Sequence, residues 1–252
     1  MLLPELAALF PGCSAPSGLG PVTGMVLIPG LNMRPGALLP LARYFEGRGL
    51  RVTIPALPAA GTVRGTMTAW CAAVAAAWNE AGSAGGRTVL AGFSLGAVLA
   101  LLLRLRLGSG EESPVLLLAP PLCLRTGAGL LAGLARIPFL SFPSLAPARF
   151  RQRSWTAGRA YRAFFLLRRL LLRHVAALGS VAGTAVFHTR DEFVHPDRSA
   201  VRLAGLSAVT VRLIDKSRRG WRSHLFVVPE SPAWDCLCKC LEHFSDSGVY
   251  SG

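Results

Sequence analysis

Short runs of consecutive apolar residues alternate along the chain with longer segments whose apolar residues recur at helical spacing. The short runs predict strands at residues 23–28, 51–54, 88–91, 115–119, 184–188 and 209–214. The longer segments predict helices at residues 35–49, 66–81, 95–107, 162–178 and 233–244. Strands that are apolar throughout and alternate with helices are typical of a parallel sheet covered on both faces. We therefore expect one α/β domain over residues 1–252.

Residues 120–161 break this alternation. The segment is rich in Pro, Gly, Phe and Arg and shows no clear period. A structureless stretch of this length inside a compact domain usually has a function. We expect a lid, inserted above the sheet at about residues 121–161.

The chain carries a formal net charge of +14, and its positive residues are nearly all arginine. Between Ser113 and Arg190 there is no Asp or Glu, whereas arginines such as Arg149, Arg151 and Arg153 are frequent. This stretch has two main interpretations: a solvated face, or a surface attracted to anionic membrane lipids through arginines and neighbouring aromatic residues. Nucleic-acid binding is disfavoured because no recognition motif accompanies the charge. The sequence predicts no particular oligomeric state.

Apolar stretches end before they reach the length that crosses a bilayer. The richest of them, at residues 163–175, is interrupted by Arg168, Arg169 and Arg173. At the N-terminus, Pro4 and Glu5 stand where a secretory signal has basic residues and an apolar core. We expect a cytoplasmic location, and the basic stretch leaves peripheral contact with an anionic membrane open.

A candidate nucleophile follows the third predicted strand. Residues 92–96 read Gly-Phe-Ser-Leu-Gly, which is a Gly-x-Ser-x-Gly pattern, with Ser94 at its centre. In this pattern a sharp turn from strand to helix lifts the serine hydroxyl clear of the sheet, and the tight turn leaves room only for glycine on either side. The strand that ends at Gly92 and the helix that begins after Ser94 supply that context.

With these residues the chain resembles the α/β-hydrolase family, in particular its monoacylglycerol lipase and lysophospholipase-like branch. The resemblance spans nearly the whole chain and includes residues 27–34, Leu-Ile-Pro-Gly-Leu-Asn-Met-Arg, which look like the oxyanion loop of that branch. It implies that the backbone N–H groups of Leu31 and Leu95 stabilise the oxyanion. Pro29 departs from the family pattern, which usually has at this position a His that braces the loop.

The same resemblance implies the partners of the serine. Asp191 and Val194 match a Gly-x-x-Asp-x-x-Val pattern after the fifth predicted strand, with His188 in place of the glycine. Asp191 is the preferred acid, and Glu192 is the alternative. His224 follows the last predicted strand, where the family places its base, and the order Ser94, Asp191, His224 is that of this fold.

These residues predict a serine hydrolase that cleaves carboxylic esters, with monoacylglycerol or lysophospholipid as plausible small-molecule substrates. The alternatives are an acyl thioesterase, and a non-catalytic protein of this fold that binds a lipid surface or a partner. The reaction needs no metal or organic cofactor. Cys236, Cys240 and His243 lie on one side of the last predicted helix, but a zinc ion would need a further ligand from elsewhere.

Overall fold

The computed structural model describes residues 4–13, 20–83, 85–108, 113–137, 139–144, 146–179, 181–204 and 208–244. Its centre is a six-stranded sheet in the order β2-β1-β3-β4-β7-β8, and every neighbouring pair is parallel. The strands span Val22–Ile28 (β1), Arg51–Thr53 (β2), Arg87–Phe93 (β3), Val115–Leu118 (β4), Gly183–His188 (β7) and Val209–Ile214 (β8). All six correspond to strands predicted from the apolar runs, and the expected parallel sheet is confirmed.

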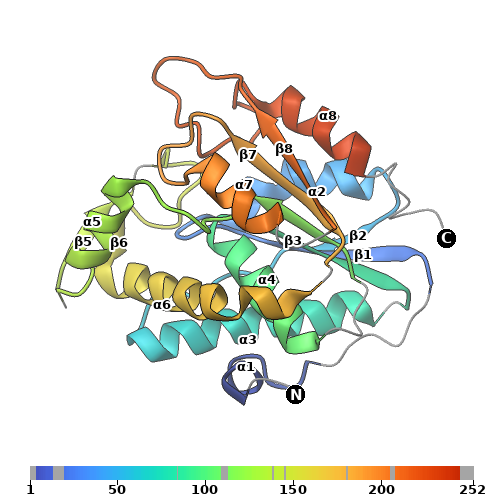
Figure 1. Ribbon diagram of the computed structural model, residues 1–252, viewed down its shortest axis with the longest axis horizontal. Helices are drawn as coiled ribbons and strands as arrows, with labels where there is room; N and C mark the ends of the chain where they lie inside the picture. The colour runs from blue at the N-terminus through green and yellow to red at the C-terminus, as the bar shows by residue number, and fades with distance from the viewer. Residues whose placement is uncertain are drawn as a thin grey trace.

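Helices cover both faces of the sheet (Figure 1). On one face α3 (Val63–Gly82), α4 (Leu95–Leu107) and α7 (Pro196–Ala204) contact the strands, and α1 (Pro4–Leu9) and α6 (Gly158–His174) pack on α3 and α4. The other face packs against α2 (Leu39–Glu46) and α8 (Trp234–Phe244). Two short 3₁₀ helices, η1 (Pro35–Leu38) and η2 (Val175–Leu178), precede α2 and follow α6. The two apolar layers explain why β1, β3 and β4 are buried along almost their whole length.

Two helices on the sheet faces were not expected from the sequence. Helix α1 buries Leu6 and Phe10 completely and packs beside α3 and α4, so the N-terminal segment belongs to the core layer. Helix α7 connects β7 to β8 and buries Ser199 and Leu203. Its helical start is marked in the sequence by Pro196 and Asp197, which are typical of a first helical turn.

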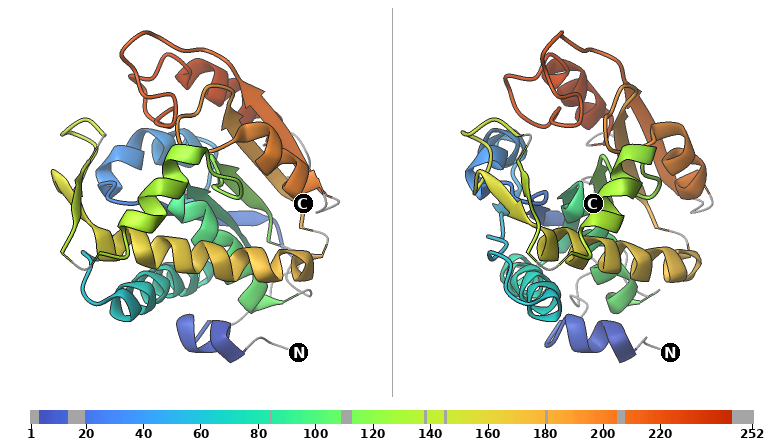
Figure 2. Two further views of the ribbon diagram at one scale, coloured as in Figure 1. Left: turned by 60° about the vertical axis from the view of Figure 1, so that its left-hand side comes forward. Right: turned by 90° about the vertical axis from the view of Figure 1, so that its left-hand side faces the viewer.

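The segment expected as an irregular lid has more regular structure than its sequence suggests. It contains α5 (Thr126–Leu134) and a small antiparallel hairpin of β5 (Ser141–Pro143) and β6 (Trp155–Ala157). The absence of a helical period around α5 has a physical cause: only Ala128 of this helix is buried, so no apolar stripe faces the core. Figure 1 shows α5 and the hairpin at the same end of the molecule, near the start of α6, and the turned views of Figure 2 show them apart from each other at this end.

None of the helices in the described part of the chain is both long enough and apolar enough to cross a membrane.

Candidate active site

Ser94 occupies a strained turn between β3 and α4. Its φ of 53° and ψ of −112° place it in a backbone region that residues with a side chain rarely adopt. The glycines on either side allow this turn. A Cβ on Gly92 would overlap the backbone of Gly96, and a Cβ on Gly96 would overlap the carbonyl of Ile28 in β1. The Gly-x-Ser-x-Gly spacing therefore follows from the close approach of three backbone segments.

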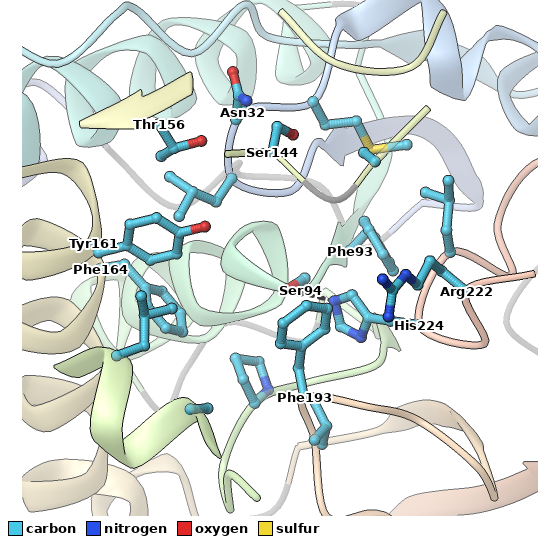
Figure 3. Close-up of a pocket in the computed structure, with 18 of the residues that line it drawn as sticks. Asn32, Phe93, Ser94, Ser144, Thr156, Tyr161, Phe164, Phe193, Arg222 and His224 are labelled. Atoms are coloured by element: carbon cyan, nitrogen blue, oxygen red, sulfur yellow. Dashed lines mark hydrogen bonds between the residues drawn. The ribbon is translucent and has the colours of Figure 1, made fainter. Parts of the chain in front are cut away.

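The structure brings the three predicted residues together in one hydrogen-bonded chain, although β3, β7 and β8 carry them from distant parts of the sequence. The hydroxyl of Ser94 lies 3.0 Å from Nε2 of His224, and Nδ1 of the same ring lies 2.7 Å from Oδ2 of Asp191 (Figure 3). All three residues follow the carboxyl ends of parallel strands, which meet at one edge of the sheet. The arrangement suits proton transfer from the serine to the imidazole.

The carboxylate of Asp191 is fully buried and held from both sides. Oδ1 accepts hydrogen bonds from the backbone N–H groups of Phe193 and Val194, both at 2.8 Å, which leaves Oδ2 for the imidazole. Burial alone would raise the pKa of Asp191. The neighbouring His224 and the two backbone N–H groups outweigh burial, so the pKa lies below its ordinary value. Asp191 is therefore ionised and fixed in one orientation.

The pKa of the His224 imidazole depends on its burial and on the neighbouring carboxylates. Burial would lower its pKa, but the charge and the hydrogen bond of Asp191, together with the charge of Glu192, raise it above the ordinary value. Two phenyl rings also flank the imidazole, with centroids at 5.0 Å for Phe93 and 5.2 Å for Phe193. These rings and the Asp191 bond fix the ring orientation and limit access of water to it.

Glu192, which the sequence offers as an alternative acid, contacts the backbone of the base loop instead of the imidazole. Oε1 accepts a hydrogen bond from the N–H of Ser223 at 2.7 Å, and Oε2 accepts one from the N–H of His224 at 2.9 Å. Sequence reasoning missed this role because Glu192 and His224 lie 32 residues apart, and no local pattern marks a contact over that distance. The structure places Asp191 against the imidazole and makes Glu192 an anchor for the loop that carries His224.

His188 stands where the family pattern has glycine, and it joins the acid loop to the segment after β8. Nδ1 of this buried residue accepts a hydrogen bond from the N–H of Arg190 at 3.0 Å. Nε2 therefore carries the proton and donates to the carbonyl of Lys216 at 3.1 Å. Arg125 supports the same loop from the other side, because its Nε donates to the carbonyl of Asp191 at 2.5 Å.

The predicted oxyanion loop is braced by the lid segment. The side chain of Asn32, a residue with a φ of 57°, donates to the carbonyl of Arg153 at 2.8 Å and accepts from its N–H at 3.0 Å. The side chain of Gln152 donates to the carbonyl of Met33 at 3.0 Å. Within the described residues, the N–H groups of Leu31 and Leu95 donate no hydrogen bond, as an oxyanion site requires.

A mostly apolar pocket of about 150 Å³ opens beside Ser94. The lid and α6 form one side of it with Thr156, Tyr161 and Phe164, and Phe193 and His224 lie across from them (Figure 3). Among the described residues that line it, three side chains can ionise: His224, Arg222 and the phenol of Tyr161. The pocket therefore offers an apolar environment to a group bound next to the serine.

Some arginines of the acid-free stretch bind within the fold, whereas others, such as Arg136, Arg153 and Arg169, are exposed, so only part of the stretch is a solvated face. Arg149 pairs with Glu230 at 3.6 Å, and Nη1 of Arg151 donates to the carbonyl of Ser144 at 3.1 Å. Arg168 donates to two carbonyls of the loop after β4, at 2.6 and 2.7 Å. The guanidinium groups of Arg151 and Arg168 therefore satisfy backbone carbonyls of the lid and of the loop after β4.

Among the residues whose side chains the structure describes, no group of three His, Cys, Asp or Glu could hold a metal ion. The side chain of His243 lies outside this set, so the grouping with Cys236 and Cys240 is not described.

The sequence matches no protein-family model and no curated protein. Solved structures match over nearly the whole chain. One belongs to the metagenome-derived lipolytic enzymes LipS and LipT, with 16% identity over 94% of this chain and 99% of that chain, and a TM-score of 0.70. The monoacylglycerol lipase of Paleococcus ferrophilus matches with 17% identity over 90% and 96% of the two chains, and a TM-score of 0.65.

A soluble variant of monoglyceride lipase from Saccharomyces cerevisiae, solved with a substrate analogue, matches with a TM-score of 0.69. Its identity is 11%, over 92% of this chain and 90% of that chain. At such identities the matches show the fold, which is the α/β-hydrolase fold expected from the sequence.

Proposed function

We propose that this protein is a serine hydrolase of carboxylic esters, with Ser94 as nucleophile, His224 as general base and Asp191 as the carboxylate that orients the base. The observation that carries this proposal is the unbroken hydrogen-bonded chain from Oγ of Ser94 through both nitrogens of His224 to Oδ2 of Asp191. The lipolytic enzymes and monoacylglycerol lipases that share the fold support the same reaction class.

The geometry suggests the order of bond changes. Neutral His224 removes the hydroxyl proton as Oγ of Ser94 attacks the acyl carbon, and Asp191 stabilises the resulting imidazolium. The bond from the acyl carbon to the alcohol oxygen then breaks, and the imidazolium gives its proton to the departing alkoxide. Water, deprotonated by His224, then attacks the acyl carbon. The bond from this carbon to Oγ of Ser94 breaks, the imidazolium returns its proton to Oγ, and the carboxylic acid leaves. No step draws on a metal or an organic cofactor.

The developing oxyanion would lie against the N–H groups of Leu31 and Leu95. Both groups lack a protein acceptor among the described residues, and Leu95 begins α4, whose positive N-terminal end favours negative charge. Losing one such donor typically costs ~3 kcal/mol of transition-state stabilisation.

The substrate class follows from the pocket. Phe164, Phe193 and Leu131 make its walls apolar, which suits a hydrocarbon acyl chain. Ligand pockets commonly hold ~300–1,000 Å³. The volume of about 150 Å³ found beside Ser94 therefore favours esters of short or medium acyl chains.

The lid offers support for peripheral contact with an anionic membrane. Its large apolar side chains Leu130, Ile137, Phe139 and Trp155 are 69%, 49%, 95% and 59% exposed. Arg136 lies among them and is exposed too. Apolar side chains beside arginines in a carboxylate-free segment suit an interface of hydrocarbon and anionic head groups. A membrane surface would deliver amphiphilic esters to the pocket beneath the lid.

A fluorophosphonate probe tests the proposal, because it reacts with an activated serine whatever the natural substrate. We expect covalent labelling at Ser94, and Ser94→Ala should abolish both labelling and hydrolysis of a short ester such as p-nitrophenyl butyrate. Ser217→Ala is a matched control, since Ser217 is exposed in the loop after β8 and lines neither the pocket nor the triad. Full labelling of the Ser94→Ala variant would overturn the assignment.

A further inference from the structure

Strands β7 and β8 end side by side, and each continues into a loop that carries one member of the proposed His–Asp pair. The last residues of the two strands are partners in the parallel register. Residues 189–194, the acid loop, then carry Asp191, and residues 215–224, the base loop, carry His224. The geometry between Asp191 and His224 therefore depends on how these two loops are held against each other.

The base loop is exposed over most of its length. Among residues 215–222, every residue except Trp221 is exposed, so the loop gains little from burial. Glu192 anchors its far end, where the N–H groups of Ser223 and His224 donate to the carboxylate. The near end, next to β8, needs an anchor of its own.

His188 supplies that anchor from inside the protein. The residue is 1% exposed, and its Nε2 donates to the carbonyl of Lys216 at 3.1 Å. Nδ1 of the same ring accepts the N–H of Arg190 at 3.0 Å, directly before Asp191. One buried ring thus fastens both the start of the base loop and the backbone next to the proposed acid.

Near the strand ends, the other side-chain links that the structure describes between the two loops meet water. Oγ1 of Thr189 donates to Oδ1 of Asp215 at 2.6 Å, and Arg190 pairs with the same carboxylate at 3.5 Å. The side chains of Arg190 and Asp215 are 70% and 58% exposed, so this ion pair contributes little. A buried group that loses its hydrogen-bond partner is costlier, because water cannot replace the partner.

We propose that His188 is a positioning residue for the hydrolysis: it holds both loops at their roots and so keeps the carboxylate of Asp191 against the imidazole of His224. The inference rests on the proposed function. The family that the sequence resembles usually has glycine at this position, and glycine has no side chain to make either bond. His188 lines neither cavity, so its effect would reach the substrate only through Asp191 and His224.

Three variants separate the two hydrogen bonds. His188→Leu removes both and keeps a buried side chain of comparable size. His188→Asn places an oxygen near the position of Nδ1 and can keep the bond from Arg190, whereas His188→Gln reaches farther and can keep the bond to Lys216. In His188→Leu, kcat should fall about tenfold while KM stays within about twofold of wild type, and each of the other two variants should lose less.

Two readouts distinguish positioning from a loss of stability. Asp191 raises the pKa of His224, and the base must be neutral, so a looser pair should move the acidic limb of the kcat/KM profile to lower pH. In proton NMR, the Nδ1 proton of His224 should lose the downfield position that its short bond to a carboxylate gives it. Val186→Ala is the matched control, because it removes buried volume inside β7 but no hydrogen bond. It should lower the unfolding temperature and keep the wild-type kcat and acidic limb.

A wild-type kcat and acidic limb in His188→Leu would overturn the inference. So would equal shifts in Val186→Ala, or equal losses in all three His188 variants, because the two hydrogen bonds would then not set the rate. If His188→Leu does not fold, wild-type behaviour of both the Asn and the Gln variant would refute the inference. Absence of fluorophosphonate labelling in the wild-type protein would refute the proposed function instead. The Nδ1 proton of His224 would still decide the inference, which fails if that resonance is unchanged in the His188 variants.

Discussion

Replacing Glu192 with Gln tests whether the base loop is held by the carboxylate that lies beside the proposed acid. Both oxygens of Glu192 accept a backbone N–H, at 2.7 Å from Ser223 and 2.9 Å from His224. The Gln side chain has nearly the same size but only one acceptor oxygen. Its NH₂ group would face one of the two backbone N–H donors, so one hydrogen bond is replaced by a repulsive contact.

The magnitude follows from that single lost bond. A hydrogen bond to a charged group contributes ~1.5–3 kcal/mol. Glu192 is only half-buried, so water replaces part of the lost hydrogen bond. We therefore expect the loop that carries His224 to lose about 1–2 kcal/mol of the free energy that holds it in place. Since ~1.4 kcal/mol corresponds to a factor of ten in rate, misalignment of His224 should lower kcat about tenfold. KM should change little because Glu192 does not line the pocket.

Steady-state kinetics on a soluble ester, with thermal unfolding measured alongside, separates this effect from a general loss of stability. Glu230→Gln is the matched control, because Glu230 is a surface carboxylate that pairs with Arg149. An unchanged kcat in Glu192→Gln would refute the anchoring role. A loss near 10⁴-fold, the size expected for an orienting carboxylate, would instead make Glu192 the acid.

Four further outcomes are expected. Asp191 raises the pKa of His224, and the base must be neutral to act. Asp191→Asn should therefore move the acidic limb of the pH profile of kcat/KM to lower pH and lower its plateau ~10⁴-fold. An acidic limb at the wild-type pH would contradict this. Gly96→Ala should destabilise the protein by about 3 kcal/mol or more in urea unfolding, and a smaller loss would mean that β1 yields to the new Cβ. Asn32→Gly keeps the positive φ of this position but removes both side-chain hydrogen bonds to the lid, so kcat should fall about tenfold. An unchanged kcat in this variant would exclude the bracing role. Phe139→Ser should weaken co-sedimentation with anionic vesicles about tenfold, and equal binding by both proteins would show that Phe139 takes no part in the membrane contact.

The sheet and the nucleophile were predictable because their signals are local. Each strand is a short apolar run bounded by Gly, Pro or polar residues, and burial on both faces requires that composition. Ser94 is marked by Gly92 two positions before it and Gly96 two positions after it, and close backbone contacts in the structure explain both glycines. Asp191 and His224 followed only from chain order and family resemblance, since neither has a diagnostic neighbourhood of its own.

Other features depend on contacts that no local pattern records. Helix α5 contains three glycines in nine residues, and its intrinsic preference for helix is correspondingly weak. Tertiary packing against α6 overrides that preference. Glu192 is only an alternative acid in the sequence, because its two backbone partners lie more than 30 residues away and leave no local pattern. The sequence could suggest a carboxylate near the base, but it could not decide which atoms the carboxylate would meet.

The lid supplies the support that the oxyanion loop lacks in its own sequence. Pro29 stands where the family that the sequence resembles usually has a bracing His, and a proline has no side-chain hydrogen bond to offer. In its place, residues 150–153 run beside residues 32–34. Their contacts include the N–H of Arg34 with the carbonyl of Phe150 at 2.9 Å and the paired bonds of Asn32 with Arg153.

This bracing couples the lid to the chemistry. If residues 150–153 moved away from the sheet, the bonds of Asn32 and Gln152 would break, and the N–H of Leu31 would lose its fixed position. An oxyanion donor is effective only when it is held in place before the reaction. Opening of the segment by that route would therefore disable the proposed oxyanion site, so the proposed mechanism requires this part of the expected lid to stay closed. Substrate would have to enter past α5 and the β5–β6 hairpin, where the exposed apolar side chains of the lid are found.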